Sequence, residues 1–176
     1  YTNFEITIVN DGSDDKYCLM KLDSLESQDG ISIIHKENTG VSDTRNIAVR
    51  EGKGEYILPK ISPVYCDTIH IGETQGLEKR PEWSKERLLQ GPFIVNSSMY
   101  SREAYETVGG YDTTLQGWED YHFWLKMMKK EYTGKHINKG LFIYFHHEKD
   151  GSVSTEANKN QQKLYKTIME KILNYE

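Results

Sequence analysis

Carboxylates stand at two points of this chain where their chemistry could be used. Asp11 follows residues 4–9, a short apolar and β-branched run that is typical of a buried strand leading into a turn. Glu119 and Asp120 are adjacent at the start of a segment whose apolar residues recur with helical spacing. Ligands of α/β proteins gather at the carboxyl ends of strands. The two acidic points therefore indicate a site that holds a polar ligand and removes a proton from something.

The segments that must position these residues alternate between strand and helix. Apolar runs predict strands at residues 4–9, 31–34, 55–58, 64–71, 93–100 and 141–145. Periodicity and capping residues predict helices at residues 14–27, 42–50 and 119–132, a short helix from residue 84, a helix from 101 to the glycines at 109–110, and a helical tail from 156. Asp14 or Asp15 is the expected cap of the first helix, and Ser42 that of the second. Strand-helix-strand-helix-strand predicts a mostly parallel α/β sheet with helices on both faces, in a single domain, residues 1–176.

One junction in this order is physically awkward. The strands at 55–58 and 64–71 are joined only by residues 59–63, which begin and end with proline. A parallel crossover needs a dozen or more residues, and a tight hairpin tolerates prolines poorly at both ends. We therefore expect that residues are missing between Leu58 and Val64, and that the chain is interrupted within 59–64.

Composition excludes several classes of protein. The chain is 36% hydrophobic and 28% charged, with a net charge of -5 and no long basic run, so a nucleic-acid surface is not expected. No segment approaches the ~20 apolar residues of a membrane span. Cys18 and Cys66 lack metal-ligand spacing, and we expect both to be reduced and buried, which fits a cytoplasmic protein.

Each candidate residue also has an interpretation without chemistry. Asp11 with Gly12 and Ser13 could simply form the turn; a calcium loop is rejected because the later Gly and bidentate Glu are absent. Arg45 could be a solvated arginine on a helix face.

The downstream candidates have structural alternatives as well. Glu119 and Asp120 could merely favour the helix N-terminus through its dipole. Trp118 could be ordinary core packing. Alternation along the last strand favours one buried and one exposed histidine at 146 and 147, although His146 is also a candidate metal ligand.

Four stretches of the chain carry a family resemblance. In order they are YTNFEITIVNDGSDD, ENTGVSDTRNIAVREGKGEYIL, VGGYDTTLQGWEDYHFWLKM and GLFIYFHHEKDGSVS. With these stretches the chain resembles a bacterial family 2 glycosyltransferase of GT-A fold. The resemblance implies a sugar transfer from a nucleotide sugar, with a UDP-sugar as the expected donor, to a hydroxyl acceptor with inversion.

The resemblance assigns roles to the candidate residues. Asp11 would accept a hydrogen bond from the nucleotide base, with Gly12 and Ser13 beside it, and Arg45 would line the same nucleotide pocket. The glycine turn before that arginine would let the backbone approach the ligand.

On the acceptor side, the resemblance makes Asp120 the general base. A sugar hydroxyl is a weak nucleophile, so a positioned carboxylate is chemically needed. Glu119 would belong to the same acceptor-side motif, and Trp118 could pack on a sugar face.

The resemblance also shows which parts are absent. Such enzymes usually begin with an earlier strand and helix, and they carry an Asp-x-Asp-Asp motif after a segment like residues 55–58. That motif would hold Mg²⁺ or Mn²⁺ on the departing diphosphate, but its ligands are not in this sequence. A domain that lacks both parts is therefore expected.

The resemblance implies a place in polysaccharide or cell-surface glycan synthesis. The expected partners are a nucleotide-sugar donor and a glycan or lipid-linked acceptor, at the cytoplasmic face of the inner membrane and compatible with peripheral association. If the metal loop is truly deleted, a non-catalytic nucleotide-sugar-binding or scaffold protein is the alternative. A sugar nucleotidyltransferase would need an N-terminal glycine-rich phosphate loop, and none is present.

Overall fold

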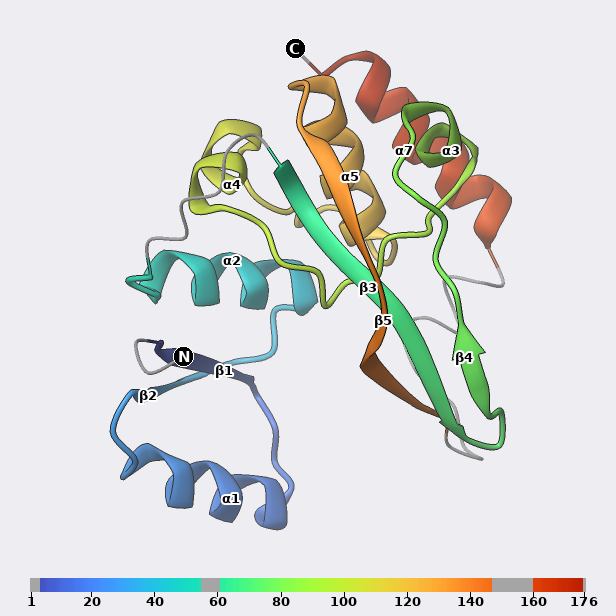
Figure 1. Ribbon diagram of the computed structural model, residues 1–176. Helices are drawn as coiled ribbons and strands as arrows, with labels where there is room; N and C mark the ends of the chain where they lie inside the picture. Colours follow the sequence, from blue (N-terminus) through green and yellow to red (C-terminus); the bar gives the residue numbers. More distant parts are fainter. Residues whose placement is uncertain (1–3, 55–60, 147–159, 176) are drawn as a thin grey trace. The chain divides into compact units, whose positions relative to one another are not determined.

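The computed structural model describes residues 4–54, 61–146 and 160–175, and the chain divides into two compact units, Tyr1–Glu55 and Tyr56–Glu176 (Figure 1). The predicted strand at 55–58, residues 59–60 of the suspected junction and His147 lie outside the described residues. A strand begins at Ile61, with a shift of its register against its parallel partner strand between Ile61 and Val64, so the part of the junction at 61–63 is not a connection but the start of a strand.

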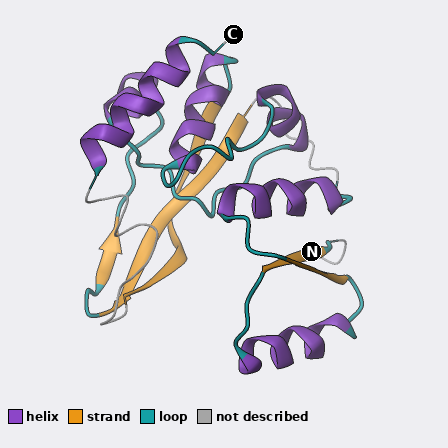
Figure 2. Cartoon of the chain, turned by 180° about the vertical axis from the view of Figure 1, so that it is seen from behind, coloured by secondary structure: helices purple, strands orange, loops and turns teal. Residues whose placement is uncertain are grey.

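The first unit is a two-stranded parallel sheet between two helices. Its elements are β1 (Ile6–Asp11), α1 (Lys16–Glu26), β2 (Ile31–Lys36) and α2 (Val41–Glu51). The strands pair in register from Ile6 opposite Ile31 to Asp11 opposite Lys36. The two helices lie on opposite faces of this sheet (Figures 1 and 2). The predicted order of strands and helices is confirmed here.

Two helix caps of this unit were predicted, one correctly. Asp15 caps α1, because its Oδ1 accepts the amide N–H of Cys18 at 2.7 Å. Ser42 does not cap α2. The helix begins one residue earlier behind Gly40, whose φ of 95° suits glycine, and the Ser42 hydroxyl is buried in the first turn without a hydrogen-bond partner in the described structure.

The second unit is built on a three-stranded mixed sheet. Its elements are β3 (Ile61–Gly72), β4 (Gly76–Glu78), α3 (Lys85–Gln90), α4 (Arg102–Val108), α5 (Glu119–Lys129), β5 (Thr133–His146) and α7 (Gln161–Leu173). The strand order is β4-β3-β5, with β3 and β5 parallel and β3 and β4 antiparallel. The mixed α/β class with parallel strands is therefore confirmed, and a short antiparallel strand is added to it.

One predicted strand of this unit is wrong. Residues 93–100 form no strand and make only an isolated bridge between Val64 and Met99. Phe93 and Ile94 are buried as expected, but the polar residues that follow turn the chain. The Ser98 hydroxyl donates to the Val95 carbonyl at 2.6 Å, which closes that turn.

Helix α5 is the centre of the hydrophobic core. Five of its side chains are at most 1% exposed, namely Tyr121, Phe123, Trp124, Leu125 and Met127, and burying one such side chain contributes about 1.5–3 kcal/mol. Helices α3, α4 and α7 contribute the buried Leu88, Val108 and Ile168. Since Asp120 is the second residue of α5, the predicted base lies on a rigid element. Among the described residues, no helix is both long and apolar enough to cross a membrane.

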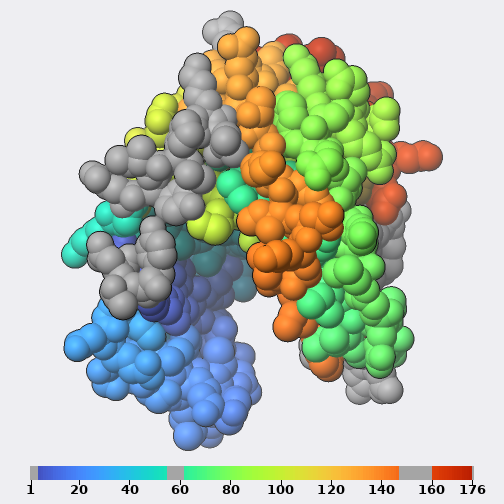
Figure 3. Space-filling model, viewed as in Figure 1, coloured from blue at the N-terminus to red at the C-terminus, as the bar shows by residue number. Residues whose placement is uncertain are grey.

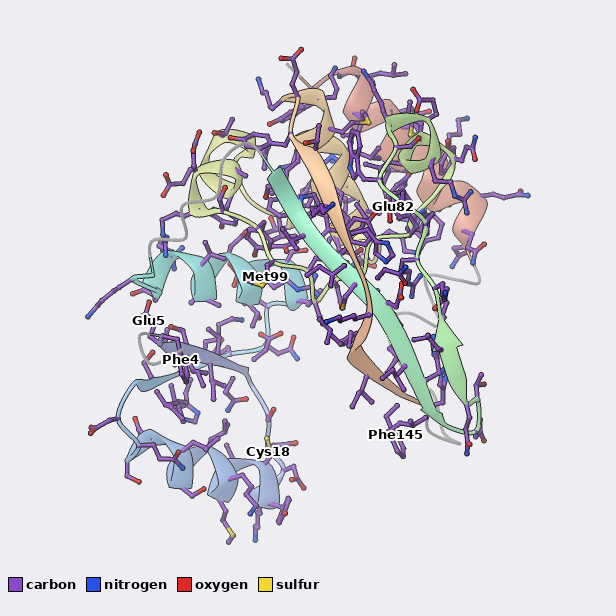
Figure 4. All side chains as sticks on the ribbon, viewed as in Figure 1. Phe4, Glu5, Cys18, Glu82, Met99 and Phe145 are labelled. Carbon is purple, nitrogen blue, oxygen red and sulfur yellow. The ribbon has the colours of Figure 1, made fainter. Side chains whose placement is uncertain are left out.

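The carboxyl half of β5 presents apolar side chains to solvent. Leu141, Ile143 and Phe145 are 63%, 60% and 51% exposed, and they alternate with half-buried neighbours along the strand. The strand is visible over its length in Figure 3, and Phe145 lies near its carboxyl end in Figure 4. Within the described residues, β5 pairs on one side only and is an edge strand.

Candidate functional site

Asp11 ends β1 and its carboxylate is bound by the segment that leads into α2. It accepts hydrogen bonds from the ammonium of Lys36, from the Thr39 amide at 2.9 Å and from the Gly40 amide at 3.2 Å. Burial raises the pKa of Asp11, but the hydrogen bonds from Lys36 and Thr39 outweigh it, so the pKa lies below its ordinary value. Asp11 is therefore an anion that fixes the loop at 37–40.

A cavity of about 560 Å³, wide open to solvent, lies beside this carboxylate in the first unit. Its lining comes from the ends of both strands, from α1 and from the loop after β2, and consists of Asn10, Gly12, Ser13, Leu19, His35, Lys36, Glu37 and Asn38. Of the predicted nucleotide-binding residues, Gly12 and Ser13 line it. Its volume is in the range of small-molecule sites.

Gly12 is required by this geometry. Its φ is 75°, and a Cβ at this position would lie 2.8 Å from the backbone nitrogen of Asn38. The absence of a side chain lets the turn after β1 approach the loop after β2, and the two together form the wall of the cavity.

Asn10 and His35 face each other across the two strands. The Asn10 side chain is buried, and its Nδ2 lies 3.0 Å from His35 Nδ1. Its Oδ1 accepts a hydrogen bond from the Ser13 amide at 3.0 Å. Neither residue was identified from the sequence. The signal that could have found them is strand register, because a parallel pairing of β1 and β2 places residues 10 and 35 opposite each other.

Arg45 lies in the second turn of α2 and is half-buried. It does not belong to the cavity lining. Asp11 accepts the amide of Gly40, the residue that precedes α2, but the predicted proximity of Asp11 to Arg45 itself stays a prediction. A contact of the guanidinium with a nucleotide stays a prediction.

In the second unit, Glu119 and Asp120 form the first turn of α5. Glu119 is 6% exposed and Asp120 is half-buried. Asp120 Oδ1 accepts the Tyr121 amide at 2.8 Å, which orients the carboxylate toward the helix start. The dipole of α5 favours a negative charge at this end.

Trp118 precedes this turn in an unusual backbone conformation. Its φ is 52° and ψ 24°, in the left-handed region where non-glycine residues are uncommon. Its ring packs edge-on against Tyr121, with centroids 5.9 Å apart. The structural interpretation of Trp118 as core packing is thus supported, while the strained backbone is of the kind that clusters at functional sites.

The predicted residues fall into two groups, one in each unit. Asp11, Gly12, Ser13 and the helix of Arg45 belong to the first unit, and residues 118–120 belong to the second. The expectation that Asp120 and Asp11 face a common cleft concerns both units together, and it stays a prediction.

His146 was the only candidate metal ligand, and its ring is engaged with another histidine. Its Nε2 lies 2.7 Å from His70 Nδ1, and His70 Nε2 lies 2.8 Å from Glu78 Oε2. Within residues 4–54, 61–146 and 160–175, no group of three or more His, Cys, Asp or Glu side chains could hold a metal ion. The described residues therefore do not form the binding site that the expected Mg²⁺ or Mn²⁺ would need.

A buried hydrogen-bond network that sequence reasoning missed joins β3 to β5. Asp67 Oδ1 lies 2.7 Å from His136 Nε2 and accepts the Arg80 amide at 2.9 Å. The His136 ring stacks on Tyr65, and its Nδ1 lies 3.1 Å from Glu82 Oε1, on the loop seen in Figure 4. The Arg80 amide and then His136 lower the pKa of Asp67. Because both central side chains are buried, this network holds the sheet rather than a ligand.

Both cysteines are free, as expected, but neither is buried as predicted, because each is half-buried. Cys18 lies in α1, and Cys66 lies in β3.

Comparison with known proteins agrees with the resemblance read from the sequence. Residues 1–59 match the family model for glycosyl transferase family 2. An uncharacterized glycosyltransferase of Haemophilus influenzae is 28% identical over 197 residues, which cover 93% of this chain and 65% of the relative. An uncharacterized glycosyltransferase of Rickettsia typhi is 26% identical over 183 residues, covering 84% of this chain and 54% of the relative.

The fold is also found among solved structures. The crystal structure of S. aureus TarS 1-349 superposes with a TM-score of 0.61 at 16% identity, covering 82% of this chain and 52% of that one. The chain thus spans between about half and two thirds of the length of the proteins it matches. The cavity lined by Gly12 and Ser13 lies inside the segment that matches the family model.

Proposed function

We propose that the chain is a glycosyltransferase of family 2 with the GT-A fold, and that it transfers a sugar from a nucleotide sugar to a hydroxyl acceptor. The proposed donor is a UDP-sugar and the proposed outcome is inversion at the anomeric carbon. The observation that carries the proposal is the cavity of the first unit, because it is built by the turn after β1 within the segment that matches the family model.

The nucleotide would bind in this cavity. Gly12 and Ser13 bring backbone to the ligand, and Asp11 holds the opposite loop through the Thr39 and Gly40 amides. Asp11 would in addition accept an N–H of the base, and Arg45 would supply donors for a carbonyl or phosphate oxygen. A preformed wall of this kind lowers the entropy lost on binding.

Asp120 would act as the general base. In a single displacement the acceptor oxygen bonds to the anomeric carbon while the bond from that carbon to the phosphate oxygen breaks. The electron pair leaves with the nucleoside diphosphate, and the hydroxyl proton moves to the Asp120 carboxylate. Glu119 and Trp118 would contact the acceptor, with the start of α5 as a rigid support.

Several finer assignments belong to the same proposal. The acceptor would be a glycan or a lipid-linked sugar used in polysaccharide or cell-surface glycan synthesis, at the cytoplasmic side of the membrane. A divalent cation is expected from the family resemblance, but no step above depends on it, because the described residues do not supply its ligands.

Binding of UDP to the wild-type chain and to Gly12→Ala, measured by calorimetry, tests the donor site. A methyl group at residue 12 would clash with the Asn38 backbone and would occupy a backbone conformation that suits glycine, so affinity should fall by about tenfold or more. Gly54→Ala is the matched control, since a Cβ there makes only an ordinary 3.7 Å contact. Equal UDP affinity in wild type and Gly12→Ala would contradict the assignment of this cavity.

A non-catalytic nucleotide-sugar-binding or scaffold protein is the second candidate. One observation favours it: the alignment with the Haemophilus relative runs over 197 residues, more than the 176 of this chain, so the relative carries residues with no counterpart here. The intact mass of the purified natural protein distinguishes the two. A mass near 20.5 kDa together with UDP binding and no sugar transfer from a panel of UDP-sugars would favour the scaffold.

A further inference from the structure

The cavity of the first unit contains a histidine whose tautomer is fixed by its neighbours. The Ser13 backbone N–H can only donate, so the Asn10 atom 3.0 Å away must be the oxygen Oδ1. The other Asn10 atom, Nδ2, is therefore a donor, and it lies 3.0 Å from His35 Nδ1. His35 Nδ1 must accept this hydrogen bond with its lone pair.

The proton of the neutral His35 ring is consequently on Nε2. Asn10 is only 7% exposed, so its amide is held by the fold and cannot rotate freely. His35 itself is exposed and lines the cavity. The arrangement turns an ordinary histidine into an oriented hydrogen-bond donor at the wall of a ligand site.

We propose that His35 determines nucleobase specificity by donating its Nε2–H to the carbonyl oxygen at position 4 of the base, so that the cavity takes a uracil nucleotide in preference to a cytosine nucleotide. This inference rests on the proposed nucleotide site. At position 4, uracil presents a carbonyl oxygen where cytosine presents an amino group, whereas both bases carry a carbonyl at position 2. An amino group facing Nε2–H would leave two donors opposed and one hydrogen bond unmade.

Two neighbouring polar side chains of the cavity, those of Lys36 and Asn10, are already engaged with the protein. The Lys36 ammonium is bound by Asp11, by the Glu37 carbonyl at 2.9 Å and by the Thr39 hydroxyl at 2.5 Å. The Asn10 amide is used on both of its atoms. For His35, in contrast, the contact with Asn10 leaves the Nε2–H as a hydrogen-bond donor for a ligand.

The test is the ratio of the dissociation constants for CDP and UDP, measured by calorimetry with the whole chain at about pH 8, where an ordinary imidazole with a pKa of about 6.5 is neutral. Wild type should prefer UDP by about tenfold or more. Asn10→Asp keeps the acceptor for Ser13 but replaces the donor with an oxygen. His35 must then carry its proton on Nδ1, and Nε2 becomes an acceptor that suits the amino group of cytosine.

The expected result is that Asn10→Asp loses or inverts the preference for UDP. Asn38→Asp is the matched control, because it adds the same charge to the cavity lining without touching His35, and it should weaken both nucleotides while preserving their ratio. If wild type binds UDP and Asn10→Asp shows the same preference for UDP, the specificity inference is overturned, while the proposed function of the cavity stands.

A second readout does not depend on any nucleotide. In ¹⁵N spectra of the histidine rings, His35 should show a protonated Nε2 in wild type and a protonated Nδ1 in Asn10→Asp, and a protonated Nδ1 in wild type would refute the inference. Failure of the wild-type chain to bind either nucleotide would instead refute the proposed function of the cavity, and the specificity with it.

Discussion

Asp67 and His136 form a buried pair that ties the two long parallel strands of the second unit together, with Asp67 Oδ1 2.7 Å from His136 Nε2. Both side chains are at most 3% exposed. The same aspartate receives the Arg80 amide, and the same histidine reaches Glu82. The pair therefore fixes the segment after β4 as well as the sheet.

His136→Ala is expected to destabilise the second unit, because it leaves the Asp67 carboxylate buried without its partner. The urea midpoint should fall clearly for His136→Ala and hardly for Glu82→Gln, since the Glu82 side chain is 76% exposed and its contact is screened by solvent. Equal midpoints for the two variants would show that the buried pair contributes no more than the exposed contact.

Acid should destabilise the protein through His122. Burial and then the nearby Lys126 charge lower the pKa of His122 from 6.5 to about 4. The unfolded chain therefore binds a proton between these values that the folded chain does not, so stability is lost as the pH falls from about 6.5 to about 4. His122→Leu removes this titration.

The difference in unfolding free energy between wild type and His122→Leu, measured in urea at several pH values, reports this contribution. It should shift in favour of the variant as the pH falls below 6.5. A difference that stays constant between about pH 7 and pH 4 would mean that His122 titrates alike in both states.

Asp11→Ala and Arg45→Ala should each weaken UDP binding while the fold remains. Loss of the Asp11 carboxylate frees the Thr39 and Gly40 amides that form part of the loop beside the cavity, and a charge-assisted hydrogen bond contributes about 1.5–3 kcal/mol, which corresponds to about ten- to a hundredfold in affinity.

Calorimetry with UDP measures the effect of these two variants, and Asp23→Ala, an exposed aspartate of α1, is the control for charge. Circular dichroism checks the fold. Unchanged UDP affinity in both Asp11→Ala and Arg45→Ala would count against their assignment to the nucleotide site.

Asp120→Asn should abolish sugar transfer and preserve donor binding. The substitution keeps the size of the side chain and removes the proton acceptor, and general-base assistance is typically worth about 10²–10⁴ in rate. Transfer assays with a UDP-sugar, run beside UDP calorimetry, separate the two effects. Near-normal turnover would reject the role, and Glu119→Gln would be the next variant to assay.

Local sequence signals predicted the first unit better than the second. In the first unit each strand and helix has its own apolar pattern, and the parallel pair follows from their order. In the second unit the amino half of β5, residues 133–140, is mostly polar. It forms a strand because β3 pairs with it and buries His136, which a pattern of hydrophobic residues does not reveal.

The candidate site was predicted in part for the same reason. Gly12 and Ser13 were found because a glycine turn after a strand is a local signal. Asn10 and His35 are 25 positions apart, and their contact depends on strand register. The left-handed backbone of Trp118 could not be predicted from the sequence either, since tryptophan has no preference for that conformation.

The apolar edge strand β5 has a practical consequence for handling this protein. Leu141, Ile143 and Phe145 lie on a strand that pairs on one side only among the described residues, and such edges recruit further strands from neighbouring molecules. Purified chains should therefore self-associate as their concentration rises. Ile143→Lys should delay precipitation, because it places a charge in the middle of this exposed apolar row.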